Sequence, residues 1–112
     1  MSVIELTEDN FDEEVIYSDI PVLVDFYATW CSPCKMLAPE IERLSKLYGD
    51  SIKVCKLNID SARSIIRRYA VESVPTVMLF LDGKITNRFT GYRPAQAEAM
   101  LRFAGVQTGK SG

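Results

Sequence analysis

The segment Val22–Tyr27 restricts the fold most, because it is a nearly unbroken run of apolar residues, Val-Leu-Val-Asp-Phe-Tyr. A strand with one exposed face alternates apolar and polar residues, whereas a strand covered on both faces reads as a continuous apolar run. The run therefore predicts a strand over Pro21–Ala28 that is buried between two layers. Such a strand needs helices on both faces of its sheet, so we expect an α/β fold.

The rest of the chain alternates strand-like and helical patterns. Thr76–Leu81 and Lys84–Thr90 are strand candidates, and Asp82-Gly83 between them is a preferred two-residue hairpin turn. Ser61 is expected to cap a helix that ends near Tyr69. Because helices separate most of the strands, we expect parallel crossovers in the sheet. The other predicted elements are strands over Val3–Leu6 and Ile52–Ile59, and helices over Phe11–Tyr17, from Pro33 to Gly49, and from Arg93-Pro94 onward.

The composition predicts one globular domain over residues 1–112, with a frayed polar tail over 107–112. A net charge of -2 argues against binding to nucleic acid or to an anionic membrane. Met1–Glu5 has neither a basic nor a long apolar stretch, so we expect no secretory signal peptide. No apolar segment is long enough to span a bilayer. The three cysteines, an odd number, fit a reducing compartment, and we expect a cytoplasmic protein.

Two of these cysteines, Cys31 and Cys34, stand three residues apart where the buried strand ends and a helix begins. Positions i and i+3 of a helix share a face, so the two sulfurs can join with little movement of the backbone. A disulfide across so short a loop contributes little to stability. It is therefore a candidate for a bond that is made and broken, and the chemistry to expect is thiol–disulfide exchange.

The place of each cysteine predicts its role. We assign Cys31 as the attacking nucleophile, because the free N–H groups and the dipole at a helix N-terminus favour a thiolate. Cys34 lies one turn inside, so we expect it to be more buried, to stay protonated and to resolve the mixed disulfide. A zinc-binding pair is the alternative, but zinc needs four ligands. The chain has no histidine and only Cys55 remains, so we expect no metal site.

Two charged residues lie in strand-like segments. Asp25 interrupts the apolar run, and burial without a partner would raise the pKa of its carboxyl group and make it a proton acceptor. The alternative is an aspartate that points to solvent at a strand edge. Lys56 lies in the predicted strand Ile52–Ile59, and a buried lysine near Asp25 would temper that shift. The alternative for Lys56 is a side chain that reaches solvent from the strand end.

Pro75 precedes the predicted strand Thr76–Leu81, a place where an X-Pro bond can be cis. A cis turn would leave the backbone of Val74 open to a substrate strand. The residue pattern alone leaves the cis and trans forms open.

Taken together, these residues resemble the thioredoxin family from about Val3 to Phe103. The resemblance implies the thioredoxin fold, an α/β fold with a central five-stranded mixed sheet flanked by four helices. It also implies a cis bond before Pro75, and that Asp25 deprotonates Cys34 through a water with Lys56 nearby. The motifs that carry it are Val24-Asp25-Phe26, Trp30-Cys31-Ser32-Pro33-Cys34-Lys35, Pro39, Lys56-Leu57-Asn58-Ile59-Asp60, Val74-Pro75-Thr76, Asp82-Gly83 and Gly91.

The same resemblance implies an apolar patch, next to Pro75, that receives the partner protein. Ser32 departs from the usual Trp-Cys-Gly-Pro-Cys motif of the family, and we expect it to tune the reduction potential together with Pro33 and Trp30. Tyr27 replaces a second tryptophan that many members carry, and its hydroxyl either hydrogen-bonds near the site or only packs there. The patch residues implied by the resemblance are Trp30, Ile59, Val74 and Gly91.

We therefore expect a protein-disulfide reductase, a monomeric dithiol carrier that reduces disulfide bonds in cytoplasmic proteins and binds no cofactor. A separate reductase, NADPH-linked or ferredoxin-linked, would restore the dithiol. One alternative is an oxidase or isomerase on the same fold, although such enzymes tend to carry a positively charged histidine between the cysteines. A second is a thioredoxin-fold binding subunit without redox activity. A glutaredoxin is disfavoured, because its usual motif has Pro-Tyr between the cysteines.

Overall fold

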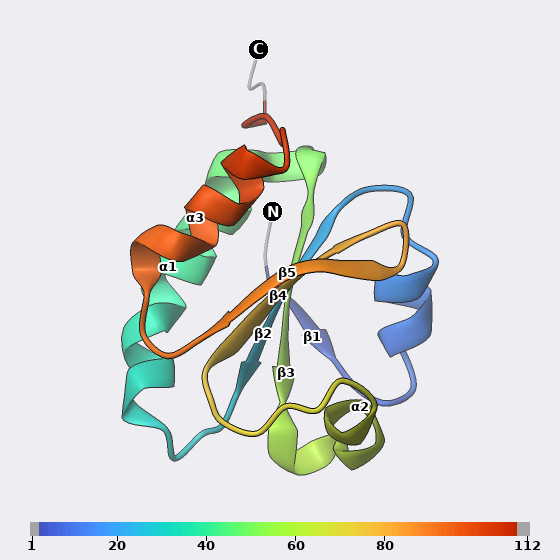
Figure 1. The fold of residues 1–112 in the computed structure, drawn as a ribbon, viewed down its shortest axis with the longest axis vertical. Helices are drawn as coiled ribbons and strands as arrows, with labels where there is room; N and C mark the ends of the chain where they lie inside the picture. Colours follow the sequence, from blue (N-terminus) through green and yellow to red (C-terminus); the bar gives the residue numbers. More distant parts are fainter. Residues whose placement is uncertain (1–2, 110–112) are drawn as a thin grey trace.

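The computed structural model describes residues 3–109 and consists of a five-stranded sheet between helices (Figure 1). The strands lie in the order β1-β3-β2-β4-β5, so the buried segment predicted from the apolar run, β2, is the central strand. The strands are β1 (Ile4–Leu6), β2 (Val22–Tyr27), β3 (Lys53–Asn58), β4 (Thr76–Leu81) and β5 (Lys84–Thr90). The helices are α1 (Ser32–Tyr48), α2 (Arg63–Arg68) and α3 (Pro94–Phe103), with short helical turns η1 (Asp12–Ile16), η2 (Gly49–Ser51) and η3 (Ile59–Ser61).

The sheet is mixed, as the family resemblance implied, but the expectation of parallel crossovers is wrong for one connection. β3 runs parallel to both β1 and β2, whereas β4 runs antiparallel to β2 and β5 antiparallel to β4. α2 has only six residues, about 9 Å of helix, and lies beyond the end of β3 (Figure 1). The connection from β3 to β4 therefore does not run back along the sheet. β4 starts at the end of the sheet where β3 ends, and it runs in the opposite direction.

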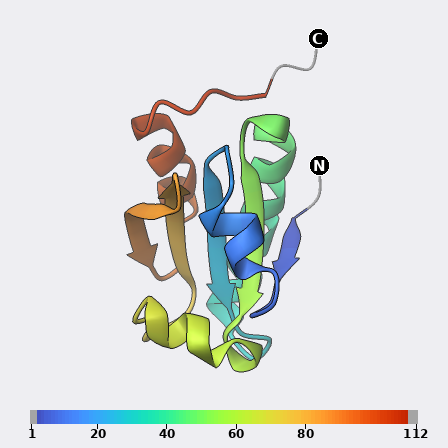
Figure 2. The same ribbon diagram turned by 90° about the vertical axis from the view of Figure 1, so that its right-hand side faces the viewer.

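Alternation along β2 places its side chains in two cores, one on each face of the sheet. Leu23 packs with α1 and α3, whereas Val24 and Phe26 pack with η1 and α2. Figure 2 shows η1 and α2 in front of the sheet, on the opposite side from α1. Both faces are covered, which accounts for the unbroken apolar run and confirms the predicted α/β architecture.

Two helical segments differ from their predictions. The sequence pattern predicts a helix over Phe11–Tyr17, and the structure has only the short turn η1, a π-helix of five residues. Ser61 does not cap α2, because the turn η3 precedes that helix and Ala62 is its N-cap residue. The side chain of Asn58 accepts a hydrogen bond from Asp60 N at 3.0 Å and so starts η3, while Ser61 Oγ donates to the carbonyl of Asn58. These hydrogen bonds hold residues 58–61 in a tight turn, so α2 does not begin with Ser61 as its cap.

The described part of the predicted polar tail, residues 107–109, is attached to the rest of the chain. Gly109 N donates a hydrogen bond to the carbonyl of Leu47 at 3.1 Å, which ties the described part of the tail to the C-terminal end of α1. Residues 110–112, the last part of the predicted tail, lie outside the described residues. Residues 1–2, part of the segment for which we expected no signal peptide, also lie outside them.

The hairpin between β4 and β5 has the predicted two-residue turn. Asp82 and Gly83 have φ angles of 52° and 77°, the left-handed conformation that such a turn requires at both positions. A Cβ atom at Gly83 would lie 2.7 Å from the carbonyl oxygen of Ile16, so this turn also packs closely against η1.

We expect Gly83→Ala to destabilise the fold more than Gly105→Ala. Gly105 has a similar φ of 80°, but a Cβ atom added there would have no neighbour within 4 Å, so its substitution reports backbone strain alone, about 1–2 kcal/mol. The clash with Ile16 should add about 1–3 kcal/mol for Gly83→Ala. Urea unfolding of both variants measures the difference, and equal free energies of unfolding would show that the contact with η1 is unimportant.

Candidate active site

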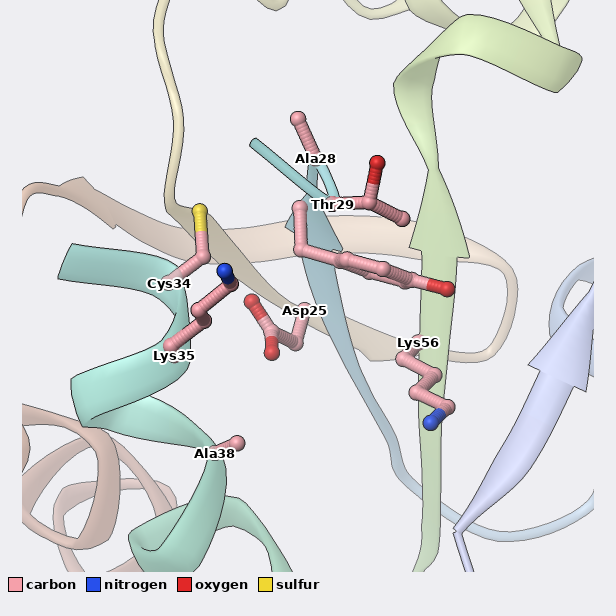
Figure 3. Close-up of a pocket in the computed structure, with 8 residues that line it drawn as sticks. Asp25, Ala28, Thr29, Cys34, Lys35, Ala38 and Lys56 are labelled. Carbon is pink, nitrogen blue, oxygen red and sulfur yellow. The ribbon is translucent and has the colours of Figure 1, made fainter. Parts of the chain in front are cut away.

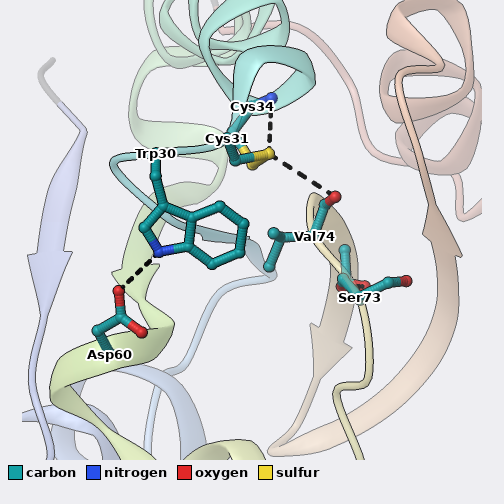
Figure 4. Close-up of a disulfide and its surroundings, with 7 residues drawn as sticks. Trp30, Cys31, Cys34, Asp60, Ser73 and Val74 are labelled. Atoms are coloured by element: carbon teal, nitrogen blue, oxygen red, sulfur yellow. Dashed lines mark hydrogen bonds between the residues drawn. A yellow bond between two sulfur atoms is a disulfide. The ribbon is translucent and has the colours of Figure 1, made fainter.

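Cys31 and Cys34 lie at the junction between β2 and α1, as the sequence predicted. They form a disulfide, with their Cα atoms 5.3 Å apart. Cys31 is the N-cap residue of α1, and its Sγ accepts a hydrogen bond from Cys34 N at 3.2 Å (Figure 4). Ser32 and Pro33 follow with exposed side chains, and the proline occupies the first turn, where a missing N–H leaves no hydrogen bond unmade. The sulfur of Cys31 therefore lies at the positive end of the helix dipole.

Cys34 was expected to be more buried than Cys31, and the difference between them is only slight. Cys34 is 4% exposed and Cys31 is 5% exposed, and Val74 and Ile59 pack against the cluster that the two cysteines form with Ala28. What separates them is direction. Cys31 Sγ lies 3.7 Å from the carbonyl oxygen of Val74, whereas Cys34 lines a partly open cavity that also contains Asp25.

The implied patch residues gather around the disulfide. Val74 and Ile59 pack against the cluster of the two cysteines, and Figure 4 shows Trp30 and Val74 in the surroundings of the disulfide. Trp30 is 67% exposed, and its Nε1 donates to Asp60 Oδ2 at 3.1 Å, which fixes the ring over the end of β3. Sequence reasoning did not identify Asp60 as the partner of this indole.

The Val74-Pro75 peptide bond is cis, which resolves the alternative that the residue pattern left open. Gly91 N donates to the carbonyl of Pro75 at 2.8 Å, so Gly91 lies next to the turn as the resemblance implied. The turn places the carbonyl of Val74 against Cys31, at the edge where β4 begins.

Asp25 is buried, with 5% of its surface exposed, so the solvent-facing alternative is excluded. It lies on β2 beneath Cys34, in a cavity of about 280 Å³, and points into the space beside Cys34 and Lys35 (Figure 3). Its Oδ1 has no hydrogen-bond partner among residues 3–109. Burial raises the pKa of the carboxyl group to about 7, an effect partly offset by the positive charge of Lys56. A carboxylate with this pKa can exchange a proton near neutral pH.

Lys56 lines the same cavity from β3, but it is not buried. Its side chain is 42% exposed, and its Nζ lies 3.7 Å from Glu5 Oε1 on β1. The structure thus combines the two alternatives from the sequence, because the stem lies near Asp25 while the ammonium group reaches solvent. The hydroxyl of Tyr27 also donates to the Glu5 carboxylate, so this hydroxyl does hydrogen-bond near the site.

Cys55 lies on the other face of the sheet. It is fully buried in the core formed with η1 and α2, and burial raises the pKa of its thiol to about 12. Within the described residues it therefore contributes no third ligand to the Cys31–Cys34 pair, and no reactive thiolate.

Comparison with known proteins agrees with this geometry. A family model described as Thioredoxin matches residues 2–102. A thioredoxin of Rickettsia bellii is 53% identical over 79 residues, which is 70% of this chain and 75% of the relative. Thioredoxin 1 of Synechococcus elongatus is 43% identical over 80% of this chain and 83% of its own. The crystal structure of Malassezia sympodialis thioredoxin (Mala s 13) superposes with a TM-score of 0.84 at 31% identity, covering 91% of this chain and 90% of that one.

A disulfide-bonded pair at a helix start, facing a cis-proline turn on this sheet, defines a thiol–disulfide oxidoreductase. With the matches above, the chain belongs to the thioredoxin family. Cys31 and Cys34 are its redox-active pair. Within residues 3–109, every helix is too short or too polar to cross a bilayer.

Proposed function

We propose that this chain, acting as one domain in the cytoplasm, is a dithiol carrier that reduces disulfide bonds in other proteins. The observation that supports it most is the different surroundings of the two sulfurs. Cys31 lies at the helix start against the open turn at Val74, and Cys34 faces a cavity that holds a buried carboxyl group. This arrangement separates an attacking sulfur from a resolving sulfur.

In the first step, the Cys31 thiolate attacks one sulfur of the partner disulfide. A bond forms between Cys31 and that sulfur, the partner S–S bond breaks, and the second partner sulfur leaves as a thiolate that takes up a proton. The hydrogen bond from Cys34 N and the dipole of α1 stabilise the Cys31 thiolate that starts this step.

In the second step, Asp25 accepts the proton of Cys34, and the resulting thiolate attacks Cys31 Sγ. The mixed disulfide breaks, the partner leaves with both sulfurs reduced, and Cys31–Cys34 becomes a disulfide. The carrier thus loses two electrons and the partner gains two. A separate reductase, NADPH-linked or ferredoxin-linked, must return two electrons to this carrier, which itself needs no bound cofactor.

The patch formed by Trp30, Ile59, Val74 and Gly91 would receive the partner segment around its disulfide. Its apolar side chains offer contact area, and the turn at Pro75 offers backbone groups to an extended segment. Trp30, Ser32 and Pro33 surround the sulfurs and would set the reduction potential.

A redox titration of the Cys31–Cys34 pair against a dithiol standard tests the direction of electron flow. We expect a reduction potential below about −230 mV, on the reducing side of the glutaredoxins. A value between about −180 and −120 mV would instead indicate an isomerase or an oxidase. If a variant without cysteines kept all biological activity, the chain would be a binding subunit.

The role of Asp25 is tested by Asp25→Asn, which keeps the shape but removes the base. We expect the resolving step to slow by about 10²-fold near pH 7. The step is followed by stopped-flow release of a chromogenic thiol from a mixed disulfide on Cys31. In the native protein this rate should rise with pH around 7, the pKa of Asp25. An identical pH–rate profile in Asp25→Asn would remove Asp25 from the mechanism.

A further inference from the structure

Three charged residues form one row across the sheet. Glu5 of β1 is paired in register with Lys56 of β3, and Lys56 is paired with Asp25 of β2. Residues paired directly across strands point to the same face. Lys56 therefore lies between two carboxyl groups. The carboxyl group of Glu5, on the β1 side, is half-exposed, and that of Asp25, on the β2 side, is buried. Because Coulomb energy falls with distance, the position of the ammonium group decides which carboxyl group it stabilises.

In the structure the ammonium group lies on the outer side. Lys56 Nζ is 3.7 Å from Glu5 Oε1 and 5.7 Å from the centre of the Tyr27 ring. Figure 3 shows the nitrogen of Lys56 turned away from Asp25. Asp25 Oδ1 is left with no hydrogen-bond partner within residues 3–109.

Glu5 is itself held in place by Tyr27. The Tyr27 hydroxyl donates to Glu5 at 3.1 Å to Oε2 and 3.3 Å to Oε1. Burial, together with this hydrogen bond, raises the pKa of Tyr27 to about 12, so the hydroxyl remains a donor at neutral pH. The half-exposed Glu5 carboxylate is thus held by Tyr27 from β2 and by Lys56 from β3.

We propose that Glu5 is a positioning residue for the proton acceptor of the site: fixed by Tyr27, it holds the Lys56 ammonium group on the solvent side and keeps it from pairing with the Asp25 carboxylate. The inference rests on the proposed function for the role of Asp25, and it adds the residues that adjust that role. If Glu5 is lost, Lys56 is free to turn inward and stabilise the Asp25 carboxylate.

Of the groups around Asp25, Lys56 and Tyr27 contact Glu5, and those from α1 and β4 have no contact with it within residues 3–109. Cys34 and Lys35 approach from α1, and Tyr27 and Lys56 line the cavity from β2 and β3. The register neighbour on β4 is Val77, which carries no charge. In the oxidised protein Cys34 is bonded to Cys31 and does not titrate. Oxidised protein therefore allows the titration of Asp25 to be followed without a thiol beside it.

The test is an NMR titration of the Asp25 carboxyl carbon in oxidised native protein, Glu5→Gln and Tyr27→Phe. Glutamine keeps an acceptor for the Tyr27 hydroxyl but has no charge to hold Lys56. We expect the pKa of Asp25 in Glu5→Gln to fall from about 7 toward its ordinary value of 3.8, because Lys56 then stabilises the carboxylate. Tyr27→Phe keeps the charge but frees Glu5, and a smaller fall is expected. Glu13→Gln, an exposed change on η1, is the matched control and should leave the pKa unchanged.

The same Glu5→Gln change in a Lys56→Gln background shows whether Glu5 acts through Lys56. The proposal expects no further fall there. An equal fall in both backgrounds, or none in Glu5→Gln, would overturn it, and no change in Tyr27→Phe would overturn the part given to Tyr27. Because this readout follows Asp25 directly, it is independent of whether the chain reduces proteins, so failure of the proposed function and failure of this inference are distinguishable.

Discussion

Cys31→Ser is expected to lose reduction of insulin disulfides by more than about 10³-fold, because no other described sulfur can attack from the surface turn at Val74. Cys34→Ser is expected to fail differently. Its Cys31 still attacks, but the mixed disulfide has no resolving thiol and accumulates. Insulin precipitation measures the first effect, and mass spectrometry of the covalent adduct measures the second.

Cys55→Ser provides the matched control for both variants. Its thiol is buried on the other face of the sheet, with a pKa raised to about 12, so its loss should leave the insulin reduction rate within about twofold. Full turnover by Cys31→Ser would contradict the assignment of the nucleophile. A Cys34→Ser variant that released its partner as fast as the native protein would contradict the assignment of the resolving thiol.

Asp25→Asn is expected to stabilise the oxidised protein at pH 8. Burial raises the pKa of the carboxyl group in the folded state to about 7 from an ordinary value of 3.8. Below about pH 4 both folded and unfolded states hold the proton, and the ionisation has no effect. Between about pH 4 and 7 only the unfolded state loses it, so the free energy of unfolding of the native protein falls as pH rises. Above pH 7 this loss in the free energy of unfolding stays constant, at an upper limit of roughly 4 kcal/mol.

Urea unfolding at pH 4, 6 and 8 measures this effect. The stability difference between Asp25→Asn and the native protein should be small at pH 4 and grow to several kcal/mol at pH 8. Glu13→Gln, with an exposed carboxylate, should show no such trend. A difference that is the same at pH 4 and pH 8 would show that ionisation of Asp25 does not govern stability. The expected result means that the chain keeps a carboxyl group that weakens its fold at neutral pH, as a functional residue does.

The sequence predictions were correct where one local pattern decides the structure, and wrong where a competing side-chain bond or a distant contact decides it. The bounds of β4 and β5 were predicted correctly, because alternation and a two-residue turn are local signals. The start of α2 was wrong, because the Asn58 side chain begins a tight turn before Ser61 can act as a cap. The direction of β4 was wrong, since it depends on where a short helix packs rather than on any residue pattern.

The site shows the same division. The Cys31–Cys34 pair and the buried Asp25 were predicted from spacing and from a charge in an apolar run. The near-equal burial of the two cysteines was not, because Val74 and Ile59 reach them from distant parts of the chain. Glu5 was missed altogether, since its contact with Lys56 requires the register of β1 against β3. Once the register of β1 against β3 is known, it identifies Glu5 as the neighbour of Lys56.

The attachment of Gly109 to Leu47 has a practical consequence for experiments on a surface. Leu47 lies at the far end of α1 from Cys31, and a helix of 17 residues is about 25 Å long. Figure 1 accordingly shows the end of α3 and the described residues that follow it at the opposite end of the molecule from the loop between β2 and α1. A link to an affinity tag or a bead that leaves the described chain at Gly109 would thus lie away from the sulfur-bearing end, so immobilised Cys34→Ser protein is suited to capturing its targets from solution.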